Sequence, residues 1–142
     1  MVAVERVGRT RIFNAQTDSP LYRPLHQLLE RTLGVEVLLR RALQDVAGVE
    51  AAAIFGSWAA GRSTDESDLD VLVLGDLDYN RLVEAIQPVG KAIGREMNLV
   101  SYSRDELRER LSRGDGFLDR VLGGATVNVV GNVRELADAA GR

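Results

Sequence analysis

Residues 51–74 read AAAIFGSWAAGRSTDESDLDVLVL, and this stretch decides the fold. Its first five residues are apolar, and apolar residues also dominate its last six, so both ends are typical of buried strands. The segment between them is polar and rich in small residues, which predicts a loop or a short turn of helix. The stretch therefore predicts two strands joined by a polar connection, the first over residues 49–55 and the second with Asp68 and Asp70 at its start.

The rest of the chain predicts alternating helices and strands around this pair. Ser103 and Glu106 form a capping-box sequence that opens a charged helix, and Pro88 is expected to bend or divide the helix in which it lies. The expected elements are strands over residues 8–13, 96–102 and 126–130, and helices over residues 19–34, 35–46, 79–93, 103–113, 117–123 and from Asn132 onwards. We therefore expect an α/β (α+β) fold with a mixed central sheet of about four strands flanked by helices.

Length and composition exclude several classes of protein. The chain has 142 residues, enough for one compact domain, and it has no cysteine and one histidine. Any metal must therefore be held by oxygen ligands. A formal net charge of −3 gives no overall attraction to nucleic acid. No apolar run can span a bilayer, and Glu5 and Arg6 lie where a signal peptide needs an apolar core, so we expect a cytoplasmic protein without membrane association.

The two aspartates suggest a magnesium site. Residues i and i+2 of a strand project from the same face, so Asp68 and Asp70 should present two carboxylates side by side. Mg²⁺ prefers such oxygen ligands together with water and phosphate oxygens. Gly56 and Ser57 follow the first strand and open what we expect to be a short helix, so their backbone N–H groups could face a triphosphate. Trp58 follows this turn, where a packing role is more common than stacking on a nucleobase.

The pattern GSWAAG followed by SDLD resembles the DNA polymerase beta-like nucleotidyltransferase superfamily, specifically its small bacterial minimal nucleotidyltransferase branch. The resemblance extends over about residues 35–131, since the order of elements also fits. It implies transfer of a nucleoside monophosphate from an NTP, expected to be ATP, to a hydroxyl group. It also implies that Asp68 and Asp70 bind Mg²⁺ and that Gly56 and Ser57 contact the β and γ phosphates. Gly61, Arg62 and Ser67 complete the nucleotide-binding set that it implies.

The sequence departs from the family pattern at two positions. Ala60 stands where the family usually has arginine, although Arg62 lies just beyond. Asn98 stands where the family has a third carboxylate, and an amide cannot act as a base. Glu96 is the candidate replacement, because it lies two residues earlier on the same face of the strand, about 6–7 Å along it. We therefore predict Asp68, Asp70 and Glu96 as the catalytic residues.

A second resemblance concerns residues 8–25, which are similar to the last wing strand and exit helix of a winged-helix regulator. We accordingly divide the chain into an N-terminal strand and helix, residues 1–34, and a nucleotidyltransferase domain, residues 35–142. The N-terminal part is either a winged-helix remnant or a dimerisation arm that makes a homodimer through residues 8–33. Because no recognition helix is included, we expect no sequence-specific DNA binding.

These observations leave two hypotheses. The first is a Mg²⁺-dependent nucleotidyltransferase whose acceptor, such as an RNA or a toxin-like protein partner, the sequence does not identify. The second is a catalytically weakened nucleotide-binding regulator or antitoxin-type partner protein, and Asn98 is the residue that favours it.

Overall fold

A computed structural model of the chain describes residues 8–12, 34–62 and 68–141. The predicted helix over residues 19–34 and the site residue Ser67 lie outside the described residues. The described elements are β1 (Gly8–Ile12), α2 (Val35–Gln44), β2 (Ala51–Phe55), α3 (Gly56–Ala59), β3 (Leu69–Leu74), α4 (Tyr79–Ile93), β4 (Met97–Tyr102), α5 (Arg104–Ser112), α6 (Gly116–Gly123), β5 (Val127–Val130) and α7 (Val133–Ala140).

The strands form a single mixed sheet, as the sequence predicts. Its order is β1-β4-β3-β2-β5, and β3 and β4 are parallel while the other neighbours are antiparallel. The sheet has five strands where about four were expected, because β1 from the N-terminal segment pairs with β4 at the edge. The division of the chain at residue 34 stays a prediction.

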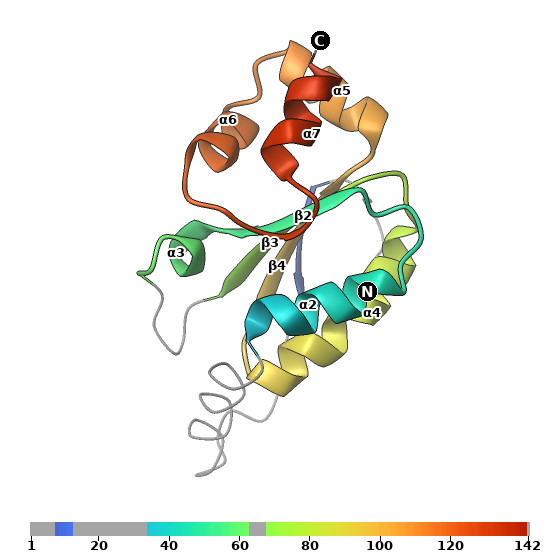
Figure 1. The fold of residues 1–142 in the computed structure, drawn as a ribbon, viewed down its shortest axis with the longest axis vertical. Helices are drawn as coiled ribbons and strands as arrows, with labels where there is room; N and C mark the ends of the chain where they lie inside the picture. The colour runs from blue at the N-terminus through green and yellow to red at the C-terminus, as the bar shows by residue number, and fades with distance from the viewer. Residues whose placement is uncertain (1–7, 13–33, 63–67, 142) are drawn as a thin grey trace.

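Helices cover both faces of the sheet. Figure 1 shows α2 and α4 on one side and α5, α6 and α7 on the other. Strand residues contribute alternately to the two hydrophobic clusters beneath these helices. Ile54 and Val71 belong to the cluster on the α2–α4 side, whereas Phe55 and Leu72 belong to the cluster beneath α5, α6 and α7. This alternation fixes which strand side chains can meet α6.

The helix ends follow the local sequence signals. Ser103 accepts a hydrogen bond from the backbone N–H of Glu106, and the Glu106 carboxylate accepts one from the backbone N–H of Ser103, which confirms the predicted capping box of α5. The Asn132 side chain caps α7 in a similar way, accepting from two backbone N–H groups. Pro88 does not divide α4, since the helix is continuous from Tyr79 to Ile93 and buried residues on both sides of Pro88 pack on one core.

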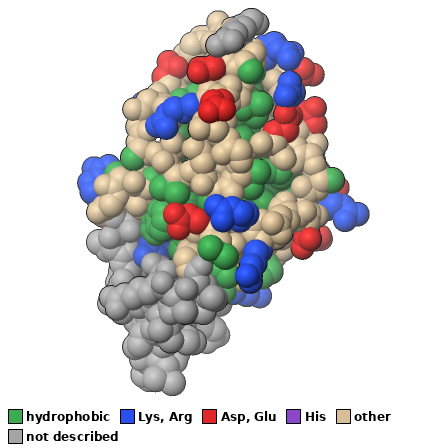
Figure 2. Space-filling model, viewed as in Figure 1, with side chains coloured by type: hydrophobic (Ala, Val, Ile, Leu, Met, Phe, Trp, Pro, Cys, Tyr) green, Lys and Arg blue, Asp and Glu red, His purple; other side chains and the backbone are tan. Residues whose placement is uncertain are grey.

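The exposed side chains are of mixed charge. On the face shown in Figure 2, acidic and basic side chains are interspersed over the described part of the molecule. None of the helices among the described residues is long and apolar enough to cross a membrane.

Candidate functional site

The two aspartates and Asn98 meet at the start of the parallel strand pair. Asp68 directly precedes β3, Asp70 is its second residue, and Asn98 is the second residue of β4. The register pairs Asp70 with Asn98 across the two strands. Neighbouring residues in register project from the same face of a sheet, so these side chains lie together.

A single amide group joins the two carboxylates. The Asn98 Nδ2 atom donates to Asp68 Oδ2 at 3.2 Å and to Asp70 Oδ1 at 2.9 Å. Asn98 itself is buried, with 5% of its surface exposed. Its partly positive amide hydrogens offset part of the repulsion between the two negative groups. Asn98, which stands in place of the family's third carboxylate, is therefore part of the carboxylate cluster.

Gly56 brings the backbone of the loop against this cluster. Phe55, the last residue of β2, pairs with Asp70, and Gly56 follows it with a φ of 74°. A Cβ built on Gly56 would lie 2.2 Å from Asp70 Oδ2, so only glycine allows this approach without moving the carboxylate. Ser57 is the next residue of the four-residue helix α3.

A pocket of about 370 Å³ opens beside Gly56. Its residues come from the motif loop and from α6 with the segment that follows, and they are Phe55, Gly56, Ala60, Arg62, Phe117, Arg120, Val121, Gly124 and Ala125. Because Phe55 and Asp70 are register partners, the pocket and the carboxylates share the sheet face that α5, α6 and α7 cover.

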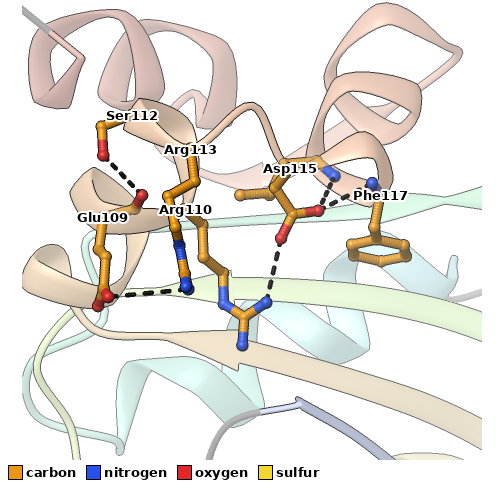
Figure 3. A network of polar contacts seen from close by, with 7 residues as sticks. Glu109, Arg110, Ser112, Arg113, Asp115 and Phe117 are labelled. Carbon is orange, nitrogen blue, oxygen red and sulfur yellow. Dashed lines mark hydrogen bonds and ion pairs between the residues drawn. The ribbon is translucent and has the colours of Figure 1, made fainter.

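A chain of polar and aromatic contacts holds α6 in place over this face, and Figure 3 shows its polar part around Asp115. Asp115 caps α6 by accepting hydrogen bonds from the backbone N–H groups of Phe117 and Leu118, at 2.8 and 3.2 Å. Its other oxygen accepts from Arg110 Nη1 at 3.0 Å, and the Arg110 guanidinium lies 4.9 Å from the centre of the Tyr102 ring. Phe117 then packs edge-on against Phe55, with ring centres 5.8 Å apart.

The charge on Asp115 is stabilised by its partners. Burial alone would raise the pKa of this carboxyl, but the hydrogen bonds from Arg110 and from the backbone of α6 outweigh it and hold the pKa below its ordinary value. The same hydrogen bond raises the pKa of Arg110, so both partners of the ion pair are stabilised in their charged forms.

The predicted site residues differ in how far the structure brings them together. Asp68, Asp70 and Gly56 converge, and Arg62 lines the adjacent pocket. Gly61 adopts a φ of 76° in an exposed turn, where an added Cβ would have nothing within 4 Å. Glu96 precedes β4, and its backbone oxygen accepts a hydrogen bond from the backbone N–H of Leu69 at 2.9 Å. The catalytic role of Glu96 stays a prediction.

Other residues at the site have roles that the motif does not reveal. Trp58 packs against the core on the α2–α4 side, in agreement with the packing interpretation. Phe117 and Arg120 line the pocket, yet they lie far along the chain from the motif, in a helix whose apolar spacing signals packing alone. No local signal connects them to the loop.

The carboxylate cluster has the donor atoms that a hard cation requires. Two carboxylates face one atom, Asn98 Nδ2, so they already converge on a common point. Among the described residues, no group of three or more histidine, cysteine, aspartate or glutamate side chains could hold a metal. A Mg²⁺ ion held by this pair would need to take its remaining ligands from water or phosphate.

The fold is thus a mixed sheet that sets an aspartate pair beside a glycine-serine turn. Residues 39–113, more than half of the chain, match the family described as "Polymerase beta, Nucleotidyltransferase". The chain belongs to this family.

Two curated relatives come from Methanocaldococcus jannaschii. "Putative protein adenylyltransferase MJ0604" is 29% identical over 59 residues, which cover 42% of this chain and 59% of the relative. "Putative protein adenylyltransferase MJ1379" is 32% identical over 66 residues, which cover 44% of this chain and 66% of the relative. The matches thus span less than two thirds of either relative.

A solved structure shares the fold. It is described as "Crystal structure of the toxin-antitoxin with AMP-PNP", and it aligns with a TM-score of 0.50 and 19% identity. The alignment covers 74% of this chain and 82% of that chain.

Substitution of Gly56 tests the geometry of the cluster. Gly56→Ala places a methyl group where Asp70 Oδ2 lies, so we expect the carboxylate to move and its hydrogen bond from Asn98 to weaken. Gly61→Ala is the matched control, because that glycine has nearly the same φ but open space around it. Both changes should cost about 1–2 kcal/mol of backbone strain. The side-chain amide signals of Asn98 in a ¹⁵N NMR spectrum should shift in Gly56→Ala alone, and their constancy would contradict this placement.

Substitution of Asp115 tests the support of α6. Asn is also a good helix cap, so Asp115→Asn should remove mainly the ion pair with Arg110 and lower stability at pH 7 by about 1 kcal/mol. Because the folded-state pKa of Asp115 is lowered, its contribution is present above the unfolded pKa and is lost as the pH falls through the folded value. Thermal unfolding of wild type and variant should therefore converge below about pH 4. Asp119→Asn, an exposed change on the same helix, should show no such convergence.

Proposed function

We propose that this domain binds an Mg²⁺–ATP complex and transfers its AMP group to a hydroxyl of an acceptor. The observation that carries the proposal is the convergence of Asp68 and Asp70 directly beside Gly56, on the sheet face that also bears a pocket. Family membership supports nucleotidyl transfer as the type of reaction.

Each part of the site has a role in this proposal. Asp68 and Asp70 hold Mg²⁺, which when bound neutralises phosphate charge and polarises the phosphoryl group. Gly56 and Ser57 offer backbone N–H groups to the β and γ phosphates, and Arg62 adds a positive charge at the pocket. Glu96 is assigned as the base that accepts the proton of the attacking hydroxyl.

The reaction forms one bond and breaks another. The acceptor oxygen attacks the α phosphorus of ATP, a new P–O ester bond forms, and the bond to the β phosphate breaks. Pyrophosphate leaves, and the hydroxyl proton passes to the base. The names of the two archaeal relatives support ATP as the nucleotide and a protein as the acceptor.

Asn98 favours a second candidate function. Its amide occupies the register position opposite Asp70, where the family pattern has a third carboxylate, and an amide cannot accept the proton of a hydroxyl. Such a site could hold Mg²⁺–ATP without transferring anything, as in a nucleotide-binding regulator or antitoxin-type partner. The toxin-antitoxin structure with the same fold, which was crystallised with AMP-PNP, is compatible with this function.

Replacement of Asp70 tests nucleotide binding, which both candidates share. Asp70→Asn removes one of two carboxylates, so we expect affinity for Mg²⁺–ATP to fall about tenfold or more while the fold is retained. Asp138→Asn makes the same change of charge at an exposed residue of α7 and should leave binding unchanged. Isothermal titration with Mg²⁺–ATP measures the difference, and equal affinities for wild type and Asp70→Asn would overturn the site assignment.

Two further variants separate enzyme from binder. If Glu96 is the base, Glu96→Gln should lower AMP transfer at least about a hundredfold yet keep Mg²⁺–ATP affinity within about threefold, whereas Glu84→Gln on α4 should change neither. If the domain is a binder, wild type should show almost no transfer from labelled ATP, and Asn98→Asp should gain it. Wild-type transfer that is unaffected by Glu96→Gln would refute the role of Glu96.

A further inference from the structure

The pocket beside Gly56 is positively charged. Of the residues that line it, Arg62 and Arg120 are the charged ones, and no carboxylate lies among them. They come from separate segments of the chain, Arg62 from the end of the motif loop and Arg120 from α6. The small side chain of Ala60 leaves space on the loop side. A ligand in this pocket would therefore meet two guanidinium groups from separate segments of the chain.

The donors of both arginines are available to a ligand. Within the part of the chain that the structure describes, neither guanidinium makes a hydrogen bond or an ion pair, and both residues are exposed. Nearby arginines have structural partners. Arg110 pairs with Asp115, and Arg134 donates to the backbone oxygens of Leu122 and Gly124. Folding therefore uses the donors of those arginines but not the donors of Arg62 and Arg120.

The pocket adjoins the carboxylate cluster. Gly56 lines the pocket, and a Cβ built on it would lie 2.2 Å from Asp70 Oδ2, so the acidic and the basic halves of the site meet at this residue. A ligand that bridges the halves needs a cation-binding, anionic part near Asp70 and a further anionic part near the arginines. A volume of about 370 Å³ holds roughly ten water molecules, which is sufficient for a chain of phosphate groups.

We infer that Arg120, together with Arg62, binds the terminal phosphates of the nucleotide and makes the site selective for a triphosphate over a monophosphate. The inference rests on the proposed function and adds α6 to the nucleotide site. Guanidinium groups present donors in a planar arrangement that matches phosphate oxygens, which explains why two unpaired arginines suit this ligand. The contact between Arg110 and Asp115 then positions a helix that binds substrate.

The test compares the binding of Mg²⁺–ATP, AMP and inorganic tripolyphosphate to the full chain by isothermal titration. In Arg120→Gln we expect affinity for Mg²⁺–ATP and for tripolyphosphate to fall about tenfold, with AMP affinity unchanged, and Arg62→Gln should act in the same direction. Arg120→Lys should recover part of the loss, since it restores charge without the planar donors. Arg41→Gln, the same charge change on α2 at the other face, should change none of the three affinities.

The outcomes distinguish this inference from the proposed function. Wild-type binding of Mg²⁺–ATP that depends on Asp70 but is equal in Arg120→Gln would overturn the role of Arg120 and leave the proposed function standing. A loss of AMP affinity equal to the loss of ATP affinity would also overturn it, because Arg120 would then act on the nucleoside or the α phosphate. Failure of wild type to bind either Mg²⁺–ATP or tripolyphosphate would refute both.

Discussion

The hydrogen bonds from one buried amide to two carboxylates are the constraint around which the site is built. Asp68 and Asp70 repel one another when both are charged, and the polypeptide must keep them together before any ligand arrives. Asn98 does this from the neighbouring parallel strand, at 3.2 and 2.9 Å. The amide contributes hydrogens where a third carboxylate would add a further negative charge. The arrangement therefore favours assembly of the aspartate pair, while the amide itself cannot act as a base.

The amide of Asn98 in place of a third carboxylate separates two properties that a three-carboxylate site combines. Holding a cation and phosphates requires negative oxygens and positive donors at the right places, which Asp68, Asp70, Gly56 and the arginine-lined pocket can supply. Deprotonation of an acceptor requires an additional basic group. Under the proposed function, this second property is assigned to Glu96, because an amide at position 98 cannot supply it. The two properties can therefore be tested separately in this domain.

Much of the fold is predictable because its signals are local. The capping box of Ser103 and Glu106, the alternation in β3 and the spacing of Asp68 and Asp70 each depend on residues within a few positions of one another. The parts that sequence alone could not supply depend on pairing between distant segments. Asn98 could be recognised as a departure from a motif, but its donation to both aspartates follows from the β3–β4 register. The pairing of β1 with β4, and the role of α6 as a pocket wall, are likewise non-local.

Strand β4 connects these distant parts. Near its start, Asn98 holds the carboxylates, and at its end Tyr102 lies beneath Arg110, which binds the Asp115 cap of α6. Both side chains project from the same face because they are four residues apart on one strand. A slip of β4 by one residue would turn both to the other face, so the acidic half of the site and the helical wall of the pocket would be lost together. The position of β4 between β1 and β3 resists such a slip, since hydrogen bonds fix its register on both sides.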